Sequence, residues 1–501
     1  MQSIGEDSQT LHNSISVSKL NEVYCKVDCE RSIARELVDY FTFEVPGAKY
    51  MPAVRNRFWD GKIRLYNQNN TIYYGLIPHI SKFCKQREYP FAIDDTIEPA
   101  DNFSLQEAAE FANTLNLPFQ ARDYQLKAFT YAVRNRRGVL LSPTASGKSL
   151  IIYLTTMWYQ SKTLIIVPTT SLVHQMATDF KDYGYKDNIH RITAGVDKIT
   201  DDMIVVSTWQ SIYKLHKDWF SQFDVVIGDE AHLFKAKSLT SIMSKLVDCK
   251  YRFGFTGTLD GALTHKLVLE GLFGPVKNIV KTKTLIKQKH LAQFKIKCVV
   301  LKYPDSITKG LAKYNYQDEV DWIVTNEYRN NFIANLSLSL KGNSLILFQF
   351  VDKHGKVLYN KIKDKAGDRP VHYVSGETNA NIREEIRAIT ETTTNGIIVA
   401  SFGTFSTGIN IRNLHNIVFT SPSKSRIRTL QSIGRGLRKA ENKDTATLID
   451  IADDLTYKSR NNFTIKHFAE RVNLYNEEEF NYKIYKVKVQ DERQLQTNTI
   501  F

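Results

Sequence analysis

The sequence predicts an α/β protein with two parallel sheets in tandem, preceded by a small α+β domain. Short β-branched runs alternate with helical segments from Arg122 to about Gly274, and the alternation restarts at Ser344. Continuous apolar strands separated by helices are typical of parallel sheets that are covered on both faces. A chain of 501 residues is also too long for one hydrophobic core and fits about three domains of ~100–200 residues each.

The order of these segments gives the expected domain boundaries. We expect a flexible N-terminus at residues 1–20, a small α+β domain at 21–115, a first α/β domain at 116–285, and a second one at 286–501 that includes a C-terminal extension. The expected strands are GVLLS, TLIIVP, MIVVST, DVVIGDE and YRFGFTGT in the first sheet, and SLILFQF, PVHYVSG, NGIIVAS, NIVFTS and TATLIDIAD in the second. In the small domain, RFWDGKIRLYN and TIYYGLIPHI read as a hairpin around the Asn-rich turn at 67–70.

The positive net charge favours a polyanionic partner. Lys and Arg number 67 against 53 Asp and Glu, a net charge of +14. Release of counterions favours binding of such a chain to phosphates, although a soluble basic protein has the same composition. The five scattered cysteines favour reduced structural thiols over a disulfide framework or a zinc site.

Targeting signals are not evident in the sequence. The N-terminal MQSIGEDSQTLHNS lacks the basic lead and apolar core of a signal peptide, and the apolar runs are strand-sized. We therefore expect a cytoplasmic protein (in the host cytoplasm if the source is a phage) that does not contact membranes and acts as a monomer.

The segment from Leu140 to Ser149 predicts a nucleotide site. It follows an expected strand and opens an expected helix, and its small residues allow backbone N–H groups to surround a β-phosphate. Lys148 is expected between the β- and γ-phosphates, and the Ser149 hydroxyl on Mg²⁺. ATP and Mg²⁺ are thus the expected cofactors, although Gly-Lys-Ser alone is a weak motif.

Two further motifs strengthen this prediction. Asp229-Glu230-Ala231-His232 ends an apolar strand, where Asp229 can hold magnesium and Glu230 can act as general base towards water. Arg435 and Arg438 are three residues apart, hence on one helical face, and can stabilise charge on the γ-phosphoryl group. An acidic turn and a solvated basic helix face are the alternatives for each motif taken alone.

Together these residues resemble superfamily 2 helicases over about residues 118–455. Matches occur in the family's order at Arg122–Gln125, Pro143–Ser149, Val167–Thr170, Ser207–Gln210, Asp229–His232, Thr256–Thr258, Thr404–Asn410 and Gln431–Arg438. The resemblance implies two RecA-like domains and an ATP-driven nucleic-acid motor. Ala145 stands where many members have Gly, and Asn410 where many have Asp.

The resemblance also implies roles for individual residues. Gln125 reads the adenine edge with Arg122 nearby, and the remaining nucleotide contacts come from Pro143, Thr144, Ala145, Ser146, Gly147, Lys148, Ser149 and Gly408. Contacts with the phosphates of the tracked strand come from Pro168, Thr169, Ser207, Thr208 and Thr404. Hydrolysis is coupled to movement through His232, Thr256, Thr258 and Gln431.

The N-terminal region narrows the resemblance. Arg55–Arg64 interleaves cations with aromatics, which is typical of a nucleic-acid surface but equally of core aromatics beside solvated cations. The segment Asn56-Arg-Phe-Trp-Asp-Gly-Lys62 ahead of a DEAH-type motor resembles the UvsW-like helicases of tailed bacteriophages, as do Trp219–Phe223 and Leu272–Pro275. Arg57, Trp59 and Lys62 are the candidate nucleic-acid contacts.

That family implies an ATP-dependent DNA helicase that remodels branched or forked DNA in recombination, replication and repair. Holliday-junction migration, fork regression and unwinding of R-loops or D-loops are the implied reactions, so RNA–DNA hybrids are also candidate partners. The alternatives are an RNA helicase, a double-stranded DNA translocase that does not separate strands, a restriction-enzyme translocase subunit, and an ATPase-dead binding scaffold.

Overall fold

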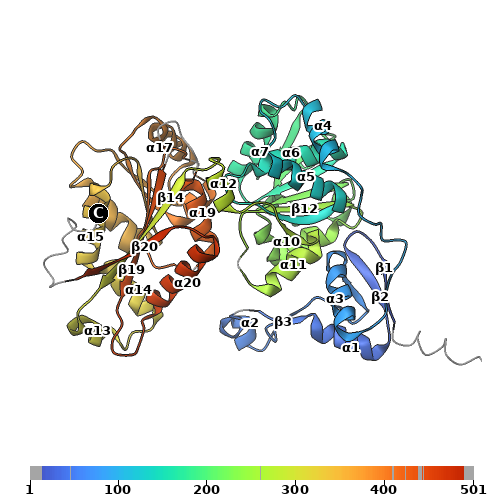
Figure 1. Cartoon of the computed structure of the whole chain (residues 1–501), viewed down its shortest axis with the longest axis horizontal. Coiled ribbons are helices and arrows are strands. Elements are labelled where there is room, and N and C mark those ends of the chain that lie inside the picture. The colour runs from blue at the N-terminus through green and yellow to red at the C-terminus, as the bar shows by residue number, and fades with distance from the viewer. Residues whose placement is uncertain are drawn as a thin grey trace, which may run out of the picture. The chain divides into compact units, whose positions relative to one another are not determined.

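The computed structural model describes residues 14–45, 47–259, 261–408, 411–423, 425–437, 443 and 445–489. The chain forms two compact units (Figure 1). The first comprises residues 1–142 and 147–279, and the second comprises residues 143–146 and 280–501. We describe each unit by itself.

The first unit begins with a four-stranded sheet in the order β5-β2-β1-β6. Its strands are β1 (Ile15–Lys19), β2 (Tyr24–Asp28), β5 (Thr71–Tyr73) and β6 (Phe91–Ile93). The helices α1 (Arg31–Tyr40) and α3 (Ile77–Arg87) bury Leu37, Ile80 and Phe83 in the same core. A separate ribbon of β3 (Thr42–Glu44) and β4 (Lys62–Arg64) carries η1 (Ala48–Tyr50) and α2 (Pro52–Arg55).

Two expectations for this region are wrong. Residues 15–19 are not part of a flexible N-terminus but form β1, because Ile15 and Val17 alternate into the core and are completely buried. The expected hairpin is reduced to one bridge between Tyr66 and Ile72, because residues 62–64 pair with β3 instead. The turn itself is present, since Asn67 N donates to Thr71 O at 2.8 Å.

The first α/β sheet has seven parallel strands in the order β13-β7-β12-β11-β8-β10-β9. Its strands are β7 (Arg137–Leu141), β8 (Thr163–Val167), β9 (Ile189–Ile192), β10 (Ile204–Thr208), β11 (Val225–Asp229), β12 (Tyr251–Thr256) and β13 (Val276–Asn278). The helices are α4 (Leu105–Thr114), α5 (Asp123–Asn135), α6 (Lys148–Tyr159), α7 (Thr170–Asp182), α8 (Trp209–Ile212), α9 (Lys217–Phe220), η3 (Ala231–Lys235), α10 (Lys237–Lys245) and α11 (Leu263–Phe273). Leu164 and Ile166 of β8 enter one core cluster, whereas Ile165 and Val167 enter another, so both faces of the sheet are covered.

The second unit repeats this architecture with seven parallel strands in the order β16-β17-β15-β18-β19-β14-β20. Its strands are β14 (Gln293–Lys302), β15 (Ser344–Phe348), β16 (Val371–Val374), β17 (Ile397–Ser401), β18 (Asn416–Phe419), β19 (Thr445–Asp454) and β20 (Tyr482–Lys488). Its helices are α12 (Thr282–Lys287), α13 (Asp305–Leu311), α14 (Tyr316–Thr325), α15 (Glu327–Ser339), η4 (Val351–Gly355), α16 (Lys356–Lys363), α17 (Ala380–Thr392), α18 (Phe402–Gly408), α19 (Arg426–Gly436) and α20 (Phe463–Glu477). The predicted fold class of two tandem α/β sheets after a small α+β domain is therefore confirmed.

Two buried ion pairs stabilise the second sheet from within. Arg471 is bidentate to Asp450 on β19, with N–O distances of 2.9 and 2.8 Å, and Arg329 Nε lies 2.8 Å from Asp453 Oδ1. All four side chains are almost completely buried. Removing one partner of such a pair leaves an uncompensated buried charge, so each pair fixes a helix against β19.

The remaining sequence predictions about cysteines and membranes concern local features. All five cysteines are free thiols, as expected. Within the residues that the structure describes, no helix has the length and apolarity that crossing a bilayer requires.

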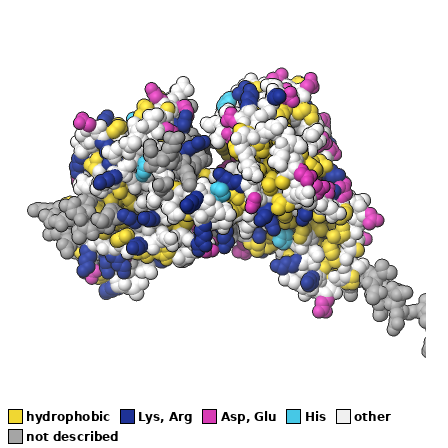
Figure 2. All heavy atoms as spheres, turned by 45° about the horizontal axis from the view of Figure 1, so that its top comes forward, with side chains coloured by type: hydrophobic (Ala, Val, Ile, Leu, Met, Phe, Trp, Pro, Cys, Tyr) yellow, Lys and Arg dark blue, Asp and Glu magenta, His cyan; other side chains and the backbone are white. Residues whose placement is uncertain are grey.

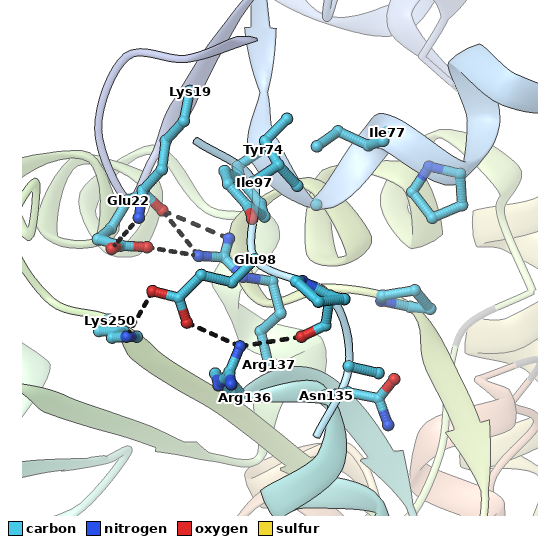
Figure 3. A pocket seen from close by; sticks show the side chains of 15 residues that line it. Lys19, Glu22, Tyr74, Ile77, Ile97, Glu98, Asn135, Arg136, Arg137 and Lys250 are labelled. Atoms are coloured by element: carbon cyan, nitrogen blue, oxygen red, sulfur yellow. Dashed lines mark hydrogen bonds and ion pairs between the residues drawn. The ribbon is translucent and has the colours of Figure 1, made fainter. Parts of the chain in front are cut away.

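One continuous hydrophobic core connects the N-terminal sheet with the first α/β sheet. We use the name joint for the place where Tyr74 and Gly75 contact Arg137 and α11. Around a cavity of about 220 Å³, each labelled cation is paired with a carboxylate (Figure 3). Arg137 donates to Glu22 at 2.9 Å and lies 3.7 Å from the ring centroid of Tyr74. Beside it, the Cα of Gly75 approaches α11 so closely that a Cβ would lie 1.9 Å from the carbonyl oxygen of Glu270.

We expect Gly75→Ala to open this joint. The added methyl group meets rigid backbone, so the N-terminal domain must move away from α11, at a cost of about 1–3 kcal/mol in the free energy of unfolding. Chemical denaturation measures the loss, and limited proteolysis at residues 94–104 reports the separation. Gly310→Ala on α13 is the matched control, because no described atom outside its own helix lies within 4 Å of its Cβ position. A Gly75→Ala protein as stable and as protease-resistant as wild type would show that the joint is not a close-packed one.

Candidate ATP site and nucleic-acid surface

The phosphate-binding turn lies between β7 and α6. Ser142 and Ser146 are completely buried, and Ser142 N donates to Thr256 O at 2.9 Å, which ties the turn to β12. Gly147 has φ +78° and precedes the first residue of α6, so the free N–H groups of that helix face the turn. Ala145 also has a left-handed φ, +67°. The position is thus one that favours Gly, which explains why related turns have Gly there.

Gln125 packs directly on this turn. Its Oε1 accepts from Arg122 N at 2.9 Å, and its Nε2 donates to Gly147 O at 3.3 Å. Arg122 is the N-cap of α5 and donates through Nη1 to Tyr124 Oη at 2.8 Å. The structure therefore brings the two predicted adenine-proximal residues beside the phosphate turn, with Gln125 fixed by hydrogen bonds at both ends of its amide.

Ser149 has a partner that the sequence did not predict. Its Oγ lies 2.7 Å from Tyr183 Oη, and Tyr183 follows α7. Burial raises the pKa of Tyr183, while this hydrogen bond lowers it. Tyr183 is the C-cap residue of a helix remote in sequence, and no local motif marks it. Its hydrogen bond orients the Ser149 hydroxyl, which we expect to bind the metal.

Asp229 and Glu230 lie at the carboxyl end of β11, in the centre of the sheet. Loss of solvation and then the charge of Glu230 raise the pKa of Asp229 to about 6, whereas the nearby Lys148 lowers it. Glu230 has φ +52°, a left-handed conformation that is strained for a non-glycine residue. A cation would stabilise the charged form of two neighbouring carboxylates, so this pair favours the binding of a cation.

These residues fit a magnesium ion held together with nucleotide. Among the described residues, no group of three or more His, Cys, Asp and Glu side chains is placed to hold a metal. Magnesium is usually held by one or two carboxylates, substrate phosphates and water rather than by a protein cage, so Asp229 with the Ser149 hydroxyl is a sufficient donor set. The ion would neutralise charge on the β- and γ-phosphates.

A continuous polar chain links the acidic motif to β12. His232 Nδ1 lies 3.3 Å from Glu230 Oε2 and 2.9 Å from Thr256 Oγ1. The Thr256 hydroxyl in turn donates to Thr258 O at 3.0 Å. Three of the four predicted coupling residues are thus in direct contact. They end on the buried Thr258, whose Oγ1 has no hydrogen-bond partner in the described part of the chain.

The predicted contacts with the tracked strand differ in exposure. Thr169 caps α7, its Oγ1 accepting from Leu172 N at 3.4 Å, while Pro168 is half-buried beside it. Thr208 is 6% exposed and lies 2.9 Å from Ser211 Oγ. Ser207 is completely buried and donates to Thr208 O at 3.0 Å, so its hydroxyl faces the protein interior and not a bound nucleic-acid strand.

Several predicted residues belong to the second unit. Thr404 lies on α18 and forms a 2.8 Å hydrogen bond with Ser401, and Gly408 is the last residue of that helix. Gln431 and Arg435 lie on α19. The side chain of Arg435 is not described, and Arg438 and Asn410 lie outside the described residues.

Arg57, Trp59 and Lys62 lie together on the β3–β4 ribbon of the first unit. Lys62 is exposed on β4, and Arg57 is exposed with φ +59°. Trp59 is half-buried, and its Nε1 donates to Lys62 O at 2.9 Å. Its neighbour Phe58 is the exposed ring, at 86%. Lys and Arg side chains are also spread over both units, interspersed with acidic ones (Figure 2).

Comparison with known proteins matches each part of the chain to a helicase-related family. Residues 14–94 match the family "DNA helicase UvsW, N-terminal", residues 118–261 match "Type III restriction enzyme, res subunit", and residues 328–440 match "Helicase conserved C-terminal domain". The ATP-dependent DNA helicase UvsW of enterobacteria phage T4 is 37% identical over 487 residues, which cover 92% of this chain and 96% of that protein.

Solved structures of related proteins share the fold of this chain. The crystal structure of T4 UvsW matches 95% of this chain and 100% of its own, with 35% identity and a TM-score of 0.50. The DNA-bound Type ISP restriction-modification enzyme LlaBIII shares the fold over 82% of this chain and 34% of its own, with 16% identity and a TM-score of 0.55. Among relatives found by sequence, the DNA 3'-5' translocase XPB2 of Sulfurisphaera tokodaii is 30% identical, over 36% of this chain and 39% of its own.

Proposed function

Because the chain belongs to the UvsW family of ATP-dependent DNA helicases, we propose that it uses ATP hydrolysis to remodel branched DNA. The chain is an ATP-dependent DNA helicase with two RecA-like domains. Branch migration of four-way junctions, regression of forks and unwinding of R-loops or D-loops are the reactions we assign to it, in recombination, replication and repair. We place it in the host cytoplasm, as a monomer.

The single observation that carries the proposal is that an N-terminal domain of UvsW type lies in one compact unit with Lys148, Ser149, Asp229 and Glu230. Of these residues, Lys148 follows the phosphate turn and would contact the nucleotide phosphates, and Asp229 with Ser149 would hold magnesium. Glu230 accepts the proton of the attacking water. His232, Thr256 and Thr258 then transmit the state of that carboxylate to β12.

The DNA contacts divide into two groups. Contacts with backbone phosphates, from Pro168, Thr169, Thr208 and Thr404, carry no preference for a branch, because phosphates are alike in every DNA. Preference for branched DNA therefore comes from the added N-terminal domain, with Arg57 and Lys62 contacting phosphates of a further arm. The alternatives are an RNA helicase, whose ATPase activity would be stimulated by RNA rather than by DNA, and a translocase, which would hydrolyse ATP on DNA without separating its strands.

The test is a full-length Arg57→Asn/Lys62→Gln variant. Asn tolerates the left-handed φ of residue 57, so the substitution removes charge without adding strain. We expect single-strand-stimulated ATPase near wild type, but weaker binding and slower migration of four-way junctions. The slope of log K against log salt should fall by about 1 for each phosphate that the variant no longer neutralises.

An Arg31→Gln/Arg35→Gln variant is the matched control, because it removes two exposed charges from α1 in the same domain. Adding Trp59→Phe to the test variant keeps an aromatic ring while removing the indole N–H; a circular-dichroism melt checks folding. Wild-type migration of junctions by the folded variants would contradict the assignment of branch preference to this domain. Stimulation of wild-type ATPase by RNA duplexes but not by DNA would contradict the DNA assignment.

A further inference from the structure

A small projection of the N-terminal domain carries unusual exposed rings. The ribbon of β3 and β4 ends in residues 47–62, which we name the tip; Figure 1 shows α2 and β3 set apart from α1 and α3. Val45 N donates to Gly61 O at 2.9 Å and closes the base of the tip. Gly61 has φ +77°, and a Cβ there would lie 3.0 Å from the Cβ of Ala48. The tip is therefore a loop that is closed at its base.

Two aromatic side chains of the tip are turned outwards. Phe58 is 86% exposed and Tyr50 is 74% exposed, and Met51 beside Tyr50 is 42% exposed. Among the described residues, only Ile199 at 82% is a large apolar side chain of comparable exposure. Aromatic rings normally contribute large buried areas, so two that face water on one loop indicate a ligand with flat apolar faces.

The backbone holds Phe58 outwards. Phe58 N and Trp59 N both donate to Ala53 O, at 2.9 and 3.1 Å, and Arg57 adopts φ +59° to allow it. Trp59 turns inwards instead, where its indole N–H donates to Lys62 O. A left-handed non-glycine residue next to an outward ring is the kind of local strain found at binding sites.

Charge indicates what the ligand is. Residues 47–62 contain four cations, Lys49, Arg55, Arg57 and Lys62, against one carboxylate, Asp60. Asp60 is paired with Arg64 at 2.5 Å and so does not neutralise these four. Exposed rings interleaved with a surplus of cations match single-stranded nucleic acid, whose bases stack on aromatics while its phosphates meet the cations. A protein partner would need the rings but not this surplus of positive charge.

We propose that Phe58 and Tyr50 stack on unpaired bases at the branch point of the DNA, with Trp59 bracing the tip from inside. Bases inside a duplex are already stacked and cannot be reached, so the tip selects junctions and forks over plain duplex. The inference rests on the proposed function and adds to it the residues and the chemical group that recognise the branch. Because the joint fixes this domain to the ATP-binding sheet, the tip moves with that sheet.

The test uses the full chain and a four-way junction with 2-aminopurine at the positions flanking the crossover. Wild-type protein is expected to change the 2-aminopurine fluorescence on binding, because stacking on a ring alters it. Tyr50→Ala/Phe58→Ala should abolish this change. It should weaken junction binding by about 5- to 100-fold per ring, leave duplex binding unchanged, and keep the wild-type salt slope. Phe58→Trp should retain the signal.

Two comparisons make the outcome specific. Ile199→Ala removes an equally exposed apolar side chain and should behave as wild type. Arg57→Asn/Lys62→Gln should lower the salt slope yet keep the fluorescence change at saturating protein. The inference is overturned if the folded double-alanine variant binds junctions with wild-type affinity, or if wild type leaves 2-aminopurine unchanged; the tip would then serve a protein partner. If wild type shows no preference for junctions or forks over plain duplex, the proposed function itself fails.

Discussion

Glu230→Gln is expected to bind ATP and DNA as wild type does and to hydrolyse ATP about 10²- to 10⁴-fold more slowly. The amide has nearly the shape of the carboxylate but cannot accept the proton of the attacking water. Glu230 is held at a left-handed φ beside Asp229, and its Oε2 lies 3.3 Å from His232 Nδ1. Its position is thus fixed by backbone and by a neighbour, and only its basicity changes in the variant.

The measurement is DNA-stimulated turnover at saturating ATP, together with nucleotide affinity by fluorescence. Asp224→Asn is the matched control, because Asp224 is an exposed carboxylate at the opposite end of the same strand. It should keep wild-type turnover. Lys148→Ala should lose turnover too, through loss of a phosphate-neutralising charge. Near-wild-type hydrolysis by Glu230→Gln would remove this residue from the role of general base.

Much of the hydrolytic centre was predictable because each motif is local. A P-loop needs only one strand, one turn and one helix, and Gly147, Lys148 and Ser149 are adjacent in sequence. Likewise, Asp229 and Glu230 follow an apolar run that reads as a buried strand. Once parallel strands are assumed, their carboxyl ends meet at one edge, which brings Glu230 near Thr256 without further information.

The features that sequence reasoning missed depend on distant or alternating residues. β14 and β20 alternate Lys with apolar residues, so QFKIK reads as a basic stretch although it is a sheet strand. The Ser149–Tyr183 hydrogen bond and the Arg329–Asp453 pair join residues 34 and 124 positions apart. Which ring of Phe58 and Trp59 faces water depends on hydrogen bonds to Ala53 O, which no periodicity reveals.

Arg438→Ala is the second variant with a large expected effect, a loss of about 10³-fold in kcat. Arg435 and Arg438 are three residues apart in sequence and follow the pattern of the family's last motif, yet every other predicted nucleotide-binding residue except Gly408 lies between residues 122 and 230. An arginine guanidinium is always charged and carries several donors, so it can stabilise charge on the γ-phosphoryl group. Because Arg438 comes from a distant part of the chain, we expect it to do so only when the motor is in its hydrolytic state.

This reasoning predicts a separation between binding and turnover. Nucleotide affinity of Arg438→Ala should change little, because Lys148, Gln125 and the phosphate turn remain, whereas kcat falls. Steady-state kinetics at saturating DNA give kcat, and titration with a fluorescent ATP analogue gives affinity. Arg387→Ala on α17 removes a surface arginine paired with Glu384 and should leave both values unchanged. A wild-type kcat for Arg438→Ala would mean that the charge is supplied by another residue, and Arg435→Ala would then be expected to carry the full loss.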